Sequence, residues 1–188
     1  MTVFESSSWA WDLAKRELEI PLRRRWAHSK GVAKAAVELA AQLSCDRDLL
    51  EASAILHDVG YAPRLAVTGF HPLDGARFLR DEHRADERLV RLVANHTFAL
   101  LEADERGLRD ELESEFPILD DPLLVDALTY CDITTTPDGT RTTAGDRVAE
   151  ILSRYGPDTL VGRFIQRAAP DIFATVTWIE QALLAHPR

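Results

Sequence analysis

Apolar residues recur every three or four positions along most of this 188-residue chain, which is the spacing of one face of an α-helix. Residues 9–20 and 22–44 show this pattern first. Gly31 lies inside the second segment, where glycine costs about 1 kcal/mol relative to alanine, so close packing is its expected reason. Asp46 is placed to cap a third helix over 47–59, and Gly60 can stop that helix.

The same spacing continues through the rest of the chain, with turn-forming residues between the segments. Further helices are predicted over 72–82, 85–96, 121–132, 144–155 and 158–185, with one or two short acidic helices within 98–120. No segment alternates apolar and polar residues with the period of two that a half-buried strand requires. The sequence therefore predicts an all-α fold.

The last predicted helices carry a broad apolar stripe. Its residues are Phe164, Ile165, Ile172, Phe173, Val176, Trp178, Ile179 and Leu183. A stripe of this kind either closes a helical bundle or forms a homodimer face, and closure of the bundle is the favoured interpretation.

The charge and cysteine content limit the expected partners. With 31 acidic against 22 basic residues, the net charge of −9 argues against binding nucleic-acid polymers or anionic membranes, although a small anionic substrate remains compatible. Cys45 and Cys131 lack CxxC spacing and are expected to be reduced core thiols. No apolar run approaches the ~20 residues of a membrane span, and the N-terminus lacks the features of a signal peptide, so we expect a cytoplasmic protein.

Histidine and aspartate residues stand where several apolar helical faces end. His57 and Asp58 follow one apolar run, His96 ends another and Asp132 ends a third, while His28 lies near the buried edge of its helix. A buried carboxylate is costly unless its charge is offset, so several such groups must pair with one another or bind a metal ion. Metal binding is the favoured interpretation.

The remaining histidines are interpreted as incidental. His83 lies in a charged turn and His186 lies near the C-terminus. Cys131, beside Asp132, is interpreted as a small core residue, because no neighbouring base would activate it as a nucleophile.

The order His28, His57-Asp58 and Asp132 on successive helices resembles the H…HD…D motif of the HD superfamily of metal-dependent phosphohydrolases. The resemblance spans about residues 22–135. It implies a single all-helical domain over 1–188, in which a bundle surrounds the site and 136–188 form additional helices packed on that core. It also implies that the four motif residues bind one divalent or ferric ion.

Two further histidines extend the resemblance to members that hold two metals. The segments beginning at His71 and His96 are similar to the extra-ligand segments of those members. By this resemblance Asp58 bridges two ions and the two histidines bind the second, whereas His71 could instead cap the following helix. Imidazole and carboxylate ligands suit iron, manganese or zinc, so one or two such ions are the expected cofactors.

The implied activity is hydrolysis of a nucleotide or a related small phosphorylated metabolite by a metal-activated water, with Asp58 as the catalytic carboxylate. Tyr61 stands where many two-metal members have a lysine, so other cations must recognise phosphate. Arg64 and Arg141 follow the two loops at the expected mouth of the site and are the predicted substrate contacts; the arginines at 23–25 also precede His28 closely.

Two other functions remain open for the same residues. Some two-iron members of the superfamily are oxygenases that cleave C–C or C–P bonds, and the same six ligands would serve them. A non-catalytic ligand-binding module is the third reading, and the intact ligand set argues against it. Oxygen uptake by the reduced iron form would identify the oxygenase, and a function that survives His57→Ala and Asp58→Ala would identify the binding module.

Overall fold

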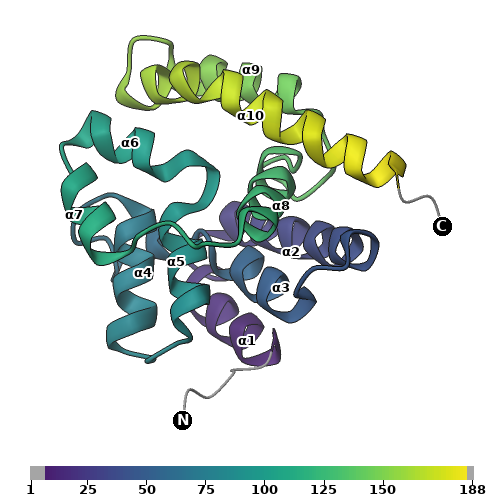
Figure 1. Ribbon diagram of the computed structural model, residues 1–188. Helices are drawn as coiled ribbons and strands as arrows, with labels where there is room; N and C mark the ends of the chain where they lie inside the picture. The colour runs from purple at the N-terminus through teal and green to yellow at the C-terminus, as the bar shows by residue number, and fades with distance from the viewer. Residues whose placement is uncertain (1–6, 186–188) are drawn as a thin grey trace.

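The computed structural model describes residues 7–185, and within them every regular element is a helix (Figure 1). The helices are α1 (Ser7–Leu18), α2 (Arg23–Leu43), α3 (Arg47–Leu56), α4 (His71–Asp81), α5 (Glu87–Asn95), α6 (Ala99–Arg106), α7 (Arg109–Glu115), α8 (Pro122–Ile133), α9 (Ala144–Tyr155) and α10 (Leu160–Ala185), with 3₁₀ turns η1 (Val59–Tyr61) and η2 (His96–Phe98). A single β-bridge joins Thr135 to Arg141 in the described part of the chain. The prediction of an all-α fold is confirmed.

The third helix ends earlier than predicted. Asp46 caps α3 as expected, its side chain accepting a hydrogen bond from the Leu49 N–H, but the helix stops at Leu56 and not at residue 59. Gly60 does not end it. A Cβ on this glycine would lie 2.0 Å from the His71 carbonyl oxygen, so its role is to let η1 pack directly on the start of α4.

The main core lies between α1, α2, α3, α4, α5 and α8, whose apolar faces meet inside the bundle. Its fully buried large residues include Leu18, Leu50, Ile55, Leu92 and Leu128. Each such side chain contributes about 1.5–3 kcal/mol relative to an exposed one. This packing fixes the ends of α3, α5 and α8, where the candidate ligands lie.

The C-terminal helices cover one end of this bundle. In Figure 1, α10 runs across the top of the molecule, above α8 and α6, and α9 packs against it. Most of its apolar stripe is buried there, Ile172 and Ile179 completely. Phe173 and Trp178 remain partly exposed, at 42% and 45%.

The loop after α8 packs on α2 through two glycines. A Cβ on Gly31 would lie 2.5 Å from the Gly139 carbonyl oxygen, and a Cβ on Gly139 would lie 2.3 Å from the carbonyl oxygen of Ala27. Gly139 also has a φ of +81°, a conformation that favours glycine. The close packing expected at Gly31 is therefore present, and it brings the Thr136 carbonyl to His28.

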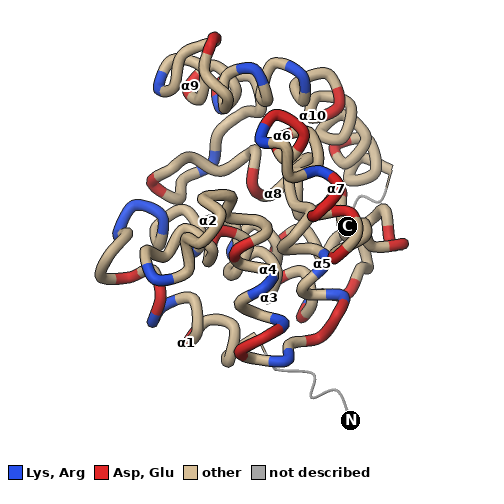
Figure 2. The backbone as a smooth tube through the Cα atoms, turned by 90° about the vertical axis from the view of Figure 1, so that its left-hand side faces the viewer, with Lys and Arg blue, Asp and Glu red and all other residues tan. Residues whose placement is uncertain are grey.

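Acidic and basic residues are interspersed along the backbone in the view of Figure 2. None of the helices within residues 7–185 combines the length and the apolar content needed to cross a bilayer. Cys45 and Cys131 are free, and burial raises the pKa of the Cys131 thiol, as expected for an inert core residue.

Candidate metal centre

All six predicted ligands lie together, although they come from different elements. His28 comes from α2, His57 and Asp58 from the turn after α3, His71 from the first turn of α4, His96 from the residue after α5, and Asp132 from the last turn of α8. Three overlapping trios have ligand atoms within 4.8 Å of one another: His28, His57 and Asp58; His57, His96 and Asp132; and Asp58, His71 and His96. Four of these side chains are buried, and those of His71 and Asp132 are 10% and 14% exposed; such groups could hold metal ions.

Backbone carbonyl groups orient three of the histidine rings. His28 Nδ1 lies 3.0 Å from the Thr136 carbonyl oxygen. His57 Nδ1 lies 2.7 Å from that of Ala54, and His96 Nδ1 lies 2.6 Å from that of Val93. A carbonyl can only accept, so each Nδ1 carries a proton, and whenever such a ring is neutral its lone pair lies at Nε2. Histidines that bind metals are held by this kind of hydrogen bond.

The inward Nε2 atoms face carboxylate oxygens and one another. That of His57 lies 3.2 Å from Asp58 Oδ2 and 3.8 Å from Asp132 Oδ1, yet it has no hydrogen-bond partner within the described residues. The Nε2 atoms of His71 and His96 are 3.1 Å apart. A histidine lone pair directed at a carboxylate is repelled unless a proton or a metal ion lies between the two groups. This donor set therefore fits metal ions.

Protons take the place of a cation in the metal-free cluster. Burial lowers the pKa of His57, but Asp58 and Asp132 outweigh burial and raise it to about 9. Burial and the neighbouring His57 and His71 lower the pKa of His96 to about 4. Although burial raises the pKa of Asp58, Arg25 and His57 hold it well below its usual range. At neutral pH the cluster thus holds ionised carboxylates beside a protonated His57.

Strained backbone turns His96 toward the cluster. The next two residues, Thr97 and Phe98, have φ values of +47° and +61°, which cost non-glycine residues about 1–3 kcal/mol each. The Thr97 hydroxyl donates a hydrogen bond to Asp132. Neither residue type signals left-handed backbone, so sequence patterns could not reveal this kink.

His71 is positioned by a loop closed on Asp74. The buried carboxylate of Asp74 accepts hydrogen bonds from the backbone of Thr68 and Gly69, which fixes the start of α4. The His71 ring stacks on Tyr61 with ring centroids 3.9 Å apart. His71 therefore faces the cluster, in addition to beginning its helix.

Arg25 pairs directly with a carboxylate of the cluster, whereas neither of the arginines predicted to contact substrate does so. Its Nη1 lies 2.7 Å from Asp58 Oδ2, and its guanidinium carbon lies 4.0 Å from the centre of the Tyr61 ring. Tyr61, found in place of a lysine, thus supports an arginine from α2.

Arg64 and Arg141 are held elsewhere. Arg64 lies 2.7 Å from Glu17 and also pairs with Glu82. Arg141 bonds to the Thr134 hydroxyl and lies 3.7 Å from Glu38, lining a different hollow. Both side chains pair with acidic residues outside the cluster, so their contact with substrate stays a prediction.

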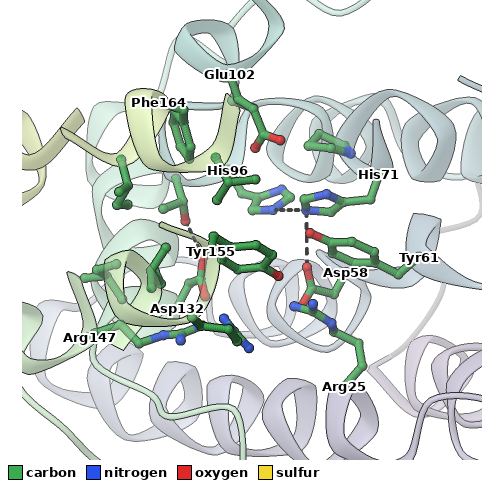
Figure 3. A pocket seen from close by; sticks show the side chains of 18 residues that line it. Arg25, Asp58, Tyr61, His71, His96, Glu102, Asp132, Arg147, Tyr155 and Phe164 are labelled. Atoms are coloured by element: carbon green, nitrogen blue, oxygen red, sulfur yellow. Dashed lines mark hydrogen bonds and ion pairs between the residues drawn. The ribbon is translucent and has the colours of Figure 1, made fainter. Parts of the chain in front are cut away.

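A cavity of about 100 Å³ adjoins the cluster (Figure 3). Its walls include Arg25, Asp58, Tyr61, His71, His96, Glu102, Asp132, Arg147, Arg154, Tyr155 and Phe164. The last four come from α9 and α10. Sequence reasoning missed them because the motif says nothing of how residues after 135 pack.

The other histidines stand apart from the cluster. His83 packs its ring against Trp9 and Phe78, as an incidental residue would. His186 lies outside the described residues.

Comparison with known proteins finds that residues 25–134 match the family described as HD domain. Two curated relatives, the tRNA (cytidine(56)-2'-O)-methyltransferases of Picrophilus torridus and Thermoplasma volcanium, are each 36% identical over 78 residues. The match covers 42% of this chain but only 22% of either relative. Most of each methyltransferase therefore has no counterpart in the match. No solved structure matches the chain.

Proposed function

The chain belongs to the HD domain family, and we propose that it is a metal-dependent phosphohydrolase acting on a nucleotide or a related small phosphorylated metabolite. One observation carries this proposal: histidine Nε2 lone pairs and two carboxylates converge beside a cavity that arginines line. The ligands suit a metal that activates water, and the arginines suit an anionic substrate.

The two oxygens of Asp58 face different histidines, which supports a bridging role. Oδ2 lies 3.2 Å from His57 Nε2 and 3.8 Å from His28 Nε2, whereas Oδ1 lies 3.3 Å from His71 Nε2. His28, His57, Asp58 and Asp132 would hold one ion, and Asp58, His71 and His96 would hold the other. Bound there, iron, manganese or zinc would supply a water acidic enough to ionise near neutral pH.

The chain's own side chains would bind and orient the substrate. Arg25 lies beside Asp58 and would bind a phosphoryl oxygen at the ligand cluster. Figure 3 shows Tyr61, Tyr155 and Phe164 around the same cavity, where their rings would pack on the organic part of the substrate. Glu102, 8% exposed and paired with Arg106, would accept a hydrogen bond from a substrate hydroxyl or amine.

The test is phosphate release by purified protein loaded with Mn²⁺ or Fe²⁺, measured over a panel of nucleotides and small phosphate esters. We expect release from a subset of the panel and none from Asp58→Ala. No release by protein that demonstrably carries metal would refute the proposal.

The oxygenase alternative uses the same ligands, so oxygen consumption by the reduced iron form is measured in parallel. The arginine-rich cavity favours the hydrolase, because a phosphate substrate brings the negative charge that these side chains bind.

A further inference from the structure

A second hollow lies beside the cavity, and arginine makes up most of its wall. It measures about 60 Å³ and is lined by Arg24, Arg25, His28, Pro137, Arg147 and Arg154. Three of these arginines, at 25, 147 and 154, also line the cavity at the ligand cluster, so the two spaces adjoin.

The four guanidinium groups share only three carboxylates among the described residues. Arg24 pairs with Asp138 at 2.8 Å and Arg25 with Asp58 at 2.7 Å. Arg147 and Arg154 both pair with Glu150. Since Asp58 belongs to the ligand cluster, a cation bound there would leave Arg25 without its counter-charge. The hollow is therefore electropositive in a chain whose net charge is −9.

Arg147 carries a buried donor that lacks a partner. Its side chain is only 8% exposed, and its Nε–H makes no hydrogen bond to any described residue. Leaving such a buried donor unsatisfied is unfavourable. Arg147 lines both the hollow and the cavity at the ligand cluster. An anion oxygen in the hollow would satisfy the donor.

We propose that the hollow is an anion subsite that binds a second phosphoryl group of the substrate. This inference rests on the proposed function for the first phosphoryl group, which lies at the ligand cluster. The substrate class is then a compound with at least two phosphoryl groups, such as a nucleoside polyphosphate or a bisphosphate. Guanidinium groups suit this task because each can donate two parallel hydrogen bonds to a phosphoryl group.

Specificity for the second group is thus a property of α9 and the start of α2. Arg147 and Arg154 belong to α9, which lies outside the residues that match the HD domain family. Glu150 lies three residues after Arg147 and four residues before Arg154 along the helix, and it pairs with both side chains at the hollow. Relatives with a different C-terminal part would lack this preference.

The test is calorimetric titration of the metal-loaded full chain with orthophosphate and with pyrophosphate, in buffer holding excess metal. We expect pyrophosphate to bind at least tenfold more tightly. Arg24→Gln and Arg154→Gln should each reduce that preference several-fold. Arg24→Gln, which removes a side chain of the hollow that does not line the cavity at the ligand cluster, should leave orthophosphate affinity and metal content unchanged. Arg163→Gln, an exposed arginine of α10 paired with Glu105, is the matched control and should keep the full preference.

Equal affinities in the wild type, no binding of either anion, or an undiminished preference in both variants would overturn the subsite. The hydrolysis panel separates this outcome from failure of the proposed function. A pyrophosphate preference without hydrolysis of any compound would refute only the enzyme, whereas hydrolysis without the preference would refute only the subsite.

Discussion

Replacement of Gly31 by alanine tests how the loop after α8 is held against α2. The new Cβ would lie 2.5 Å from the Gly139 carbonyl oxygen, 2.6 Å from its Cα and 2.8 Å from its carbonyl carbon. All three are backbone atoms, so no side chain can rotate away. The loop would have to retreat by about 1 Å to restore a normal contact distance of about 3.5 Å.

Two opposing effects decide the sign of the stability change. Alanine in a helix interior gains about 1 kcal/mol over glycine. Overpacking costs about 1–3 kcal/mol, and the retreating loop also loses the 3.0 Å hydrogen bond between the Thr136 carbonyl and His28, worth about 1 kcal/mol. We therefore expect Gly31→Ala to lower the free energy of unfolding by about 1–3 kcal/mol and to weaken metal binding through the misplaced His28.

Urea unfolding and a metal titration measure both effects. Gly145→Ala is the matched control, because it lies in α9 and its new Cβ would meet only the Thr143 hydroxyl oxygen, at 3.8 Å, within the described residues. We expect the control to keep or gain stability. If Gly31→Ala were as stable as Gly145→Ala and bound metal equally well, the packing argument would be wrong.

Three further predictions concern charge. Arg25→Gln should lower the melting temperature of the metal-free protein, because Asp58 loses its 2.7 Å partner. Added metal should then raise the melting temperature of the variant by more than it raises that of the wild type, and equal increases would contradict this expectation. Metal affinity should rise by up to tenfold per pH unit from about pH 6.5 to 9, because binding displaces a proton from His57, whose pKa is about 9; a flat calorimetric profile over that range would count against it. Arg64→Gln should lower the free energy of unfolding, measured in urea, by about 1–3 kcal/mol, because Glu17 is only 6% exposed and loses its main partner. The same variant should leave phosphate release unchanged; reduced release by a variant of wild-type stability would show that Arg64 contacts the substrate.

Helical periodicity and the placement of polar residues were enough to predict much of the fold and the ligand cluster. His57, His96 and Asp132 each stand where an apolar helical face ends, and ends of packed helices meet in a bundle. The order of these residues along the chain supplied the family. The tautomers of the histidine rings could not be predicted from the sequence and come from the structure. The groups that hold the rings are the backbone carbonyls of Thr136, Ala54 and Val93, and a backbone carbonyl is present at every residue, whatever its side chain.

The substrate side of the site depends on tertiary packing and could not be predicted in the same way. Arg64 was favoured because it follows the His57-Asp58 loop, but a half-buried position beside Glu17 holds it elsewhere. Arg25 was one of three adjacent arginines, and only the Tyr61 ring and Asp58 distinguish it. Arg147 enters the site because α10 packs across α8 and carries α9 with it, a contact between segments far apart in the chain.

The proposal of a shared carboxylate is tested most directly by counting bound metal. Wild-type protein, Asp58→Ala, His71→Ala and the control His83→Ala are loaded identically, desalted and analysed by elemental mass spectrometry, with circular dichroism to establish that each is folded. We predict two ions per chain in the wild type and the control, one in His71→Ala and none retained in Asp58→Ala. A folded Asp58→Ala variant that kept the wild-type metal content would contradict the account.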